Sequence, residues 1–180
     1  MSRHLVAILA IVAAMASLAA LLAVALPTPS ADSEDAAVRA ADFTLPDLGG
    51  EPVTSRALQG RVVIVDVWAT WCGPCISEIP AYNALHEELS GEGVEFLAVT
   101  VQSGSSDQVR AVVESGRYGI NYPVVMATAE FEREFGPLWA LPTTFVIDQH
   151  WRVRQRWVGV VPDKHEQIRA LIEELLAADG

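Results

Sequence analysis

The chain has 180 residues and a formal net charge of −11, with 23 acidic residues against 12 Lys and Arg. This length accommodates one domain with a short appendage. The acidic balance argues against a nucleic-acid partner, because phosphate backbones are bound by clustered Lys and Arg. We interpret the excess of acidic residues as a feature that keeps the domain soluble.

The first 26 residues have the composition of a targeting segment. Arg3 precedes an apolar run from Leu5 to Leu26, in which Ser17 is the only polar residue. The run exceeds the ~7–15 apolar residues of a secretory signal and matches the ~20 that span a bilayer. Ala23-Val24-Ala25 nevertheless fits a cleavage site. We expect residues 1–26 to be a signal anchor, with a cleaved signal peptide as the alternative, and either form sends the rest of the chain out of the cytoplasm.

The remaining chain predicts one linker and one domain. Residues 27–41 are rich in Pro, Ala, Ser and Asp, which predicts a solvated linker. Residues 42–180 show helices alternating with strands after an initial hairpin, which predicts an α/β domain with a central mixed sheet. The expected elements are a hairpin of 43–45 and 52–54, a helical turn at 56–58, strands at 62–68, 94–101, 122–126, 143–147 and 151–158, and helices after 72, at 107–115, at 130–135 and from about 163 to 176.

The last predicted strand has an alternating pattern. Arg152, Arg154 and Arg156 would share one face, and the odd-numbered residues of 151–157 would share the other. Two interpretations of the arginine face stay open, namely an exposed strand face and a surface for an acidic partner.

The two cysteines of the chain form a Cys72-Gly73-Pro74-Cys75 motif between a predicted strand and a predicted helix. This placement is typical of a thiol–disulfide redox site. A cysteine at a helix N-terminus faces unpaired N–H groups and the helix dipole, which lower its pKa from ~8.5 to roughly 3.5–7.5. Pro74 suits the first helical turn, where a missing N–H costs no hydrogen bond.

Other readings of the cysteine pair are weaker. A structural zinc site needs about four ligands, and no second cysteine pair or spaced histidine pair accompanies the motif. A structural disulfide closing so short a loop would gain little chain entropy. A Cu(I) site made of two thiolates stays open, because soft thiolates suit that ion. We expect no metal and no cofactor for the redox function.

Three segments carry a family resemblance. They are residues 65–75, which end in Thr70-Trp71-Cys72-Gly73-Pro74-Cys75, then Ser77-Glu78-Ile79-Pro80, and then Leu141-Pro142-Thr143-Thr144-Phe145. Together they resemble the thioredoxin superfamily in its extracytoplasmic TlpA/ResA-like branch. The resemblance runs from about Phe43 to Ala178 and implies a thioredoxin fold with an N-terminal β-hairpin.

The resemblance implies roles for the motif residues. Cys72 would be the attacking thiolate and Cys75 the buried resolving cysteine, and Pro142 would be the family's cis-proline. Without the resemblance, a trans proline would be the default, because only ~5–6% of X-Pro bonds are cis. Trp71 either covers the active site or packs in the core. The residues expected to contact a substrate are Trp71, Gly73, Pro74, Leu141 and Pro142.

Two carboxylates complete the predicted site. Asp66 stands in the apolar strand at the position of the buried carboxylate of thioredoxin, where much of the TlpA/ResA-like group carries an amide. Burial would raise its pKa and allow it to deprotonate Cys75, whereas the alternative is a buried polar group satisfied by a neighbour. Glu78 resembles a glutamate that tunes the cysteines in ResA-type proteins, and the alternative is a first-turn acid that stabilises the helix dipole.

The functional expectation is a monomeric, membrane-tethered reductase of protein disulfides that faces the bacterial periplasm, or is secreted if the signal is cleaved. The Gly73-Pro74 dipeptide resembles reducing members of the superfamily. The resemblance implies a membrane electron donor and substrates in cytochrome c or copper-site maturation. The alternatives are an oxidase or isomerase of secreted proteins and a Cu(I)-binding assembly module.

Overall fold

The computed structural model describes residues 38–138 and 140–178, so the predicted anchor or signal segment at 1–26 lies outside it. Within those residues no helix is long and apolar enough to cross a membrane. The elements in chain order are β1 (Thr44–Pro46), β2 (Pro52–Thr54), α2 (Ser55–Leu58), β3 (Val62–Trp68), α3 (Gly73–Leu89), β4 (Val94–Thr100), α4 (Ser106–Glu114), β5 (Val124–Met126), α5 (Ala129–Phe135), β6 (Thr143–Ile147), β7 (Val153–Val158) and α6 (Lys164–Ala178).

A five-stranded mixed sheet in the order β5-β4-β3-β6-β7 forms the centre of the domain. The central strand β3 runs parallel to β4 and antiparallel to β6, with Asp66 opposite Ala98 on one side and Thr144 on the other. All residues of β3 are buried, as a strand covered on both faces requires. The fold confirms the predicted α/β class, the hairpin and every predicted strand and helix to within a few residues.

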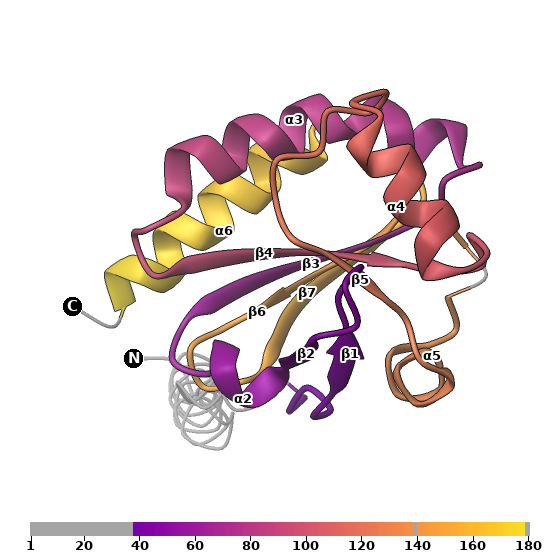
Figure 1. Ribbon diagram of the computed structural model, residues 1–180. Helices are drawn as coiled ribbons and strands as arrows, with labels where there is room; N and C mark the ends of the chain where they lie inside the picture. The colour runs from indigo at the N-terminus through magenta and orange to yellow at the C-terminus, as the bar shows by residue number, and fades with distance from the viewer. Residues whose placement is uncertain (1–37, 139, 179–180) are drawn as a thin grey trace, which may run out of the picture. The chain divides into compact units, whose positions relative to one another are not determined.

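Two layers cover the sheet. Figure 1 shows α3, α4 and α6 on one face and the hairpin, α2 and α5 on the other. Along β3, Ile64 and Trp68 belong to the hydrophobic cluster under α3 and α6, whereas Val65 and Val67 belong to the cluster on the hairpin side. Because side chains alternate along a strand, Asp66 points to the layer that contains α3 and α6.

The hairpin side of the sheet has an aromatic core. The rings of Phe131 and Phe135 stack with centroids 4.4 Å apart. Phe43 packs edge-on against Phe131 at 5.8 Å and lies 5.9 Å from the Trp151 ring. Rings in these geometries add favourable contacts beyond the area they bury, and they attach the hairpin to the sheet.

The described part of the predicted linker pairs with the edge of the sheet. The Ala40 N–H donates to the Trp151 carbonyl, and the Val153 N–H donates to the Val38 carbonyl, both at 2.9 Å. Strand edges are rows of unpaired backbone groups, so residues 38–41 cover part of the outer edge next to β7.

The predicted face assignment of the last strand is wrong. The register between β6 and β7 shifts at Val146 and Ile147, which leaves Arg154 as an extra residue in a β-bulge. A bulge reverses the alternation of side chains beyond it. Trp151 therefore packs on the hairpin side, whereas Trp157 packs in the cluster under α6.

Arg154 and Arg156, which were expected on a shared face, are engaged within the domain. The Arg154 guanidinium lies 3.4 Å from the buried carboxylate of Asp148. The Arg156 guanidinium lies 5.2 Å from the centroid of the Phe145 ring and donates to the Pro137 carbonyl at 3.0 Å. These contacts favour a structural role for both side chains.

Candidate active site

The cysteine motif lies where β3 ends and α3 begins. The Cys72 N–H donates to the Ala69 carbonyl at 3.0 Å, which closes the turn after the strand. Cys72 is the N-cap of α3, and its Sγ accepts a hydrogen bond from the Cys75 N–H at 3.3 Å. Pro74 stands in the first helical turn, as predicted. An amide aimed at Cys72 Sγ would stabilise a thiolate there after reduction.

The two cysteines form a disulfide with their Cα atoms 5.3 Å apart. Both are buried, with exposed fractions of 5% for Cys72 and 2% for Cys75. The accessible groups around them are Gly73 and Pro74 in the same turn and the neighbouring Trp71. The site therefore meets solvent through the outer surface of this turn.

Trp71 stands on the surface beside the disulfide. Its side chain is 61% exposed, so the core-packing interpretation of this residue is wrong. The indole Nε1–H donates to the Gln102 carbonyl at 2.9 Å, and Gln102 has a φ of +49°. Two further contacts hold the turn, because the Thr70 N–H donates to Ser103 and the Tyr118 hydroxyl donates to the Thr70 carbonyl.

The Leu141–Pro142 peptide bond is cis, as the resemblance predicted, and Gly136–Pro137 is a second cis bond that was not predicted. Leu141 is half-buried against the hydrophobic cluster that contains both cysteines. The Pro142 carbonyl accepts from the Gly159 N–H at 2.7 Å, and the Ala140 carbonyl accepts from the Thr143 hydroxyl at 2.6 Å. The backbone on both sides of Leu141 is thus fixed within the domain.

Asp66 is buried, with an exposed fraction of 4%. Its Oδ2 accepts a hydrogen bond of 3.4 Å from the Tyr122 hydroxyl, and Oδ1 is buried with no hydrogen-bond partner. The pKa of Asp66 is raised from 3.8 to about 7. Burial is the main cause and the charge of Glu78 adds to it, while the Lys164 charge and the Tyr122 hydrogen bond act in the opposite direction. The expectation of a raised pKa is confirmed. The alternative, a buried polar group satisfied by a neighbour, holds for Oδ2 and not for Oδ1.

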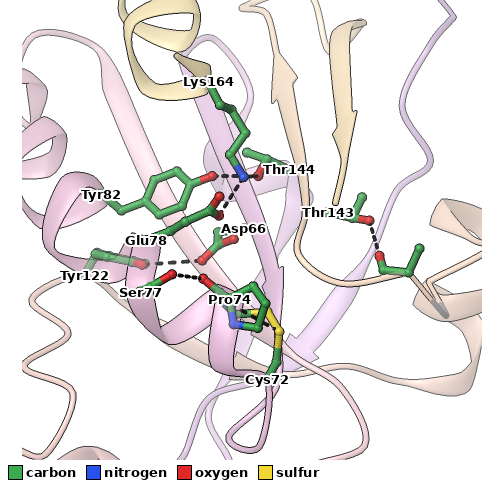
Figure 2. A network of polar contacts seen from close by, with 12 residues as sticks. Asp66, Cys72, Pro74, Ser77, Glu78, Tyr82, Tyr122, Thr143, Thr144 and Lys164 are labelled. Atoms are coloured by element: carbon green, nitrogen blue, oxygen red, sulfur yellow. Dashed lines mark hydrogen bonds and ion pairs between the residues drawn. A yellow bond between two sulfur atoms is a disulfide. The ribbon is translucent and has the colours of Figure 1, made fainter. Parts of the chain in front are cut away.

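Glu78 forms a buried ion pair that the sequence did not predict. Its Oε2 lies 2.6 Å from the Lys164 Nζ, and the Lys164 side chain is 1% exposed. The first turn of α3 holds no acidic residue, so the interpretation of Glu78 as a first-turn dipole acid is wrong. Lys164 also donates to Thr144 Oγ1 at 3.5 Å, and the same oxygen lies 2.6 Å from the Tyr82 hydroxyl (Figure 2).

These groups form one buried polar network. In the view of Figure 2, the Asp66 carboxyl group lies between the Glu78–Lys164 pair and the disulfide. The His165 ring packs edge-on against the Tyr82 ring with centroids 4.7 Å apart, and burial lowers the pKa of His165. The structure thus brings Asp66 and Glu78 into one layer with Cys75, on the cysteines' buried side.

Sequence reasoning missed Lys164 and Tyr122. The one signal for Lys164 was that it is the chain's only lysine, standing just before the apolar stripe of the last helix. Lysines are almost never fully buried unless they are paired, and the partner lies 86 residues earlier. Pairing over such a separation has no local pattern.

The chain is similar to known proteins in sequence and in fold. A family model described as Redoxin matches residues 35–172. The thiol-disulfide oxidoreductase ResA of Halalkalibacterium halodurans is 33% identical over 139 residues, which cover 77% of each chain. ResA of Bacillus subtilis is 34% identical over 124 residues, covering 69% of this chain and 68% of that protein. The solved structure of a thiol:disulfide interchange protein of the thioredoxin family from Chlorobium tepidum is 31% identical, with a TM-score of 0.67, covering 78% of this chain and 97% of that one. The Redoxin match includes the whole site from Asp66 to Lys164.

Proposed function

Because the chain belongs to the Redoxin family, as a ResA-like thiol–disulfide oxidoreductase with a thioredoxin fold, we propose that it reduces disulfides of partner proteins outside the cytoplasm. The observation that carries the proposal is the Cys72–Cys75 disulfide at the start of α3 with the buried Asp66 carboxyl group in the layer beneath it. A carboxyl group with a pKa of about 7 exchanges its proton at neutral pH.

The reductive cycle starts from the dithiol. The Cys72 thiolate attacks one sulfur of the substrate disulfide, which forms a mixed disulfide and releases a substrate thiolate that takes a proton from solvent. Cys75 then gives its proton to Asp66, and its thiolate attacks Cys72 Sγ. The mixed disulfide breaks, the Cys72–Cys75 disulfide forms, and the second substrate thiolate leaves. Two electrons have passed to the substrate, and the closed disulfide of the structure is the oxidised product.

A membrane electron donor of dithiol type completes the cycle. It returns two electrons to the Cys72–Cys75 disulfide, and Asp66 returns its proton to Cys75. A substrate segment would lie across Trp71, Gly73 and Pro74 and pair with the backbone at Leu141, as in β-augmentation. Following the family resemblance, we propose apocytochrome c or proteins of copper-site assembly as the substrate class.

A trapping experiment tests this function. In Cys75→Ser, the Cys72 thiolate still attacks but the resolving step is blocked, so partners should accumulate as mixed disulfides that mass spectrometry identifies. Cys72→Ser is the matched control and should trap none. If Cys75→Ser captures no cysteine-containing partner in cells, the proposed reductase function is wrong.

The direction of electron flow is tested by the reduction potential. Equilibration with glutathione should give a value well below the about −120 mV of the oxidant DsbA. A potential near that value would identify an oxidase instead. Tight stoichiometric Cu(I) binding without reduction of insulin disulfides would identify a copper assembly module.

The cellular location is a separate part of the proposal. The apolar segment at 5–26 supports a domain tethered to, or exported across, the cytoplasmic membrane. After mild reduction of intact cells, a thiol reagent that cannot cross this membrane should label Cys72. Labelling that appears only after the membrane is lysed would place the domain inside the cytoplasm and contradict the proposal.

A further inference from the structure

Lys164 is a buried cation for which the thiol chemistry alone gives no reason. It begins α6 and its side chain is 1% exposed. An ammonium group removed from water needs a charged partner and further hydrogen bonds. Lys164 has both, namely Glu78 at 2.6 Å and Thr144 at 3.5 Å, and its Nζ lies 5.7 Å from the centroid of the Tyr82 ring.

The network around Lys164 contains two carboxyl groups and one buried ammonium. The single positive charge of Lys164 can balance only one negative carboxylate, and the contacts show which carboxyl group that is. Glu78 binds the ammonium directly, whereas Asp66 has one hydrogen bond of 3.4 Å to a phenol and one oxygen without a partner. An isolated buried carboxylate is strongly disfavoured, so the favoured arrangement in the oxidised protein is an ionised Glu78 beside an Asp66 that holds the proton released by Cys75.

We propose that Lys164 is a positioning residue of the redox site: by holding Glu78 as the ionised carboxylate, it assigns to Asp66 the proton that Cys75 releases. The inference rests on the proposed function, because it presupposes that Asp66 takes this proton. It adds the reason why one of two neighbouring buried carboxyl groups receives it. The proton moves from Cys75 Sγ to an Asp66 oxygen, and the Glu78–Lys164 pair keeps its charges unchanged.

The two charges next to Asp66 shift its pKa in opposite directions, so removing each of them should have opposite effects. The Lys164 charge lowers the pKa of Asp66, and the Glu78 charge raises it. The titratable and polar groups of the packed elements that surround Asp66 are Cys75, Glu78 and Tyr82 from α3, Tyr122 before β5, Thr144 from β6, and Lys164 and His165 from α6. Tyr122 stays a neutral donor, because burial raises its pKa.

The test follows the Asp66 carboxyl carbon by NMR in the full-length oxidised protein in detergent, with 13C-labelled aspartate. The Asp66 signal is assigned by its loss in Asp66→Asn, and its midpoint should lie at about pH 7. Glu78→Gln removes the negative charge and should move the midpoint down. Adding Lys164→Met to that variant removes the positive charge and should move the midpoint up again by roughly one unit, a shift typical of a nearby charge.

The double variant replaces a buried ion pair with neutral groups, which proteins tolerate better than a lone buried charge. Arg169→Met is the matched control, because it removes a cation from the same helix α6 that pairs at the surface with Glu88. It should leave the Asp66 midpoint unchanged. Structural damage alone would not give shifts of opposite sign.

A kinetic arm separates failure of this inference from failure of the proposed function. In single-turnover reduction of a mixed disulfide, the pH midpoint of the resolving step should follow the Asp66 midpoint of each variant. If Asp66→Asn resolves at the parental rate, the base role itself is wrong. If Asp66→Asn is slow but neither Glu78→Gln nor the double variant moves the Asp66 midpoint, the role of Lys164 is wrong.

Discussion

The buried carboxyl group of Asp66 should make the oxidised protein lose stability as the pH rises from about 4 to 7. Its pKa is raised by burial from 3.8 to about 7, so between these values the folded state holds a proton that the unfolded chain has released. Stability falls with pH wherever the folded state binds more protons. The stabilisation is complete below pH 3.8 and is lost as the pH passes 7. At 1.36 kcal/mol per pKa unit, the loss amounts to about 4 kcal/mol.

Asp66→Asn removes this loss, because an amide keeps the shape and can accept from Tyr122 without titrating. Both proteins are unfolded with urea at pH values from 4 to 8, and unfolding is followed by tryptophan fluorescence. The difference in unfolding free energy between Asp66→Asn and the parent should shift by about 4 kcal/mol in favour of Asp66→Asn from pH 4 to pH 8. A pH-independent difference for Asp66→Asn would refute a raised pKa and with it the choice of Asp66 as the base.

Three further substitutions test packing, capping and the substrate surface. Phe131→Ala empties a buried site stacked on Phe135 and should lower the free energy of urea unfolding by about 3–5 kcal/mol; a loss below that range would mean that the aromatic core closes over the cavity. Ser105→Ala breaks the capping box of α4 and should cost about 1 kcal/mol in the same assay. Trp71→Ala should change the unfolding free energy by less than about 1 kcal/mol, since the side chain is 61% exposed, yet it should slow reduction of a protein disulfide more than reduction of a small aromatic disulfide. Equal slowing of both reactions would contradict a role in holding protein substrates.

The parts of the fold that the sequence predicted have local signals. The run from Val62 to Trp68 is apolar enough to require burial on both faces, and it forms the central strand. Pro74 has the positional preference of a first helical turn, and it stands in the first turn of α3 with Cys72 as the N-cap. The raised pKa of Asp66 followed from its place in that strand, because a carboxyl group between apolar neighbours is desolvated.

The parts that were missed depend on contacts between distant segments. The bulge at Arg154 changes the face of Trp157 relative to Trp151, and nothing in an alternating pattern marks where the alternation reverses. Lysine is a residue type that usually lies at the surface. Only the packing of α6 beside α3 brings Lys164 to Glu78. The bulge depends on strand pairing and the ion pair depends on helix packing. The residues next to them in the sequence do not predict either feature.

The separation between the cysteine motif and Lys164 has a consequence for the order of synthesis. A chain that emerges from its N-terminus presents Cys72 and Cys75 long before β6 and α6 exist, and two cysteines three positions apart can close a disulfide without the rest of the fold. Glu78 gains its buried partner only after α6, which carries Lys164, has packed beside α3. The sulfur chemistry is thus available early, while the buried ion pair beside the site forms only once α6 has been made.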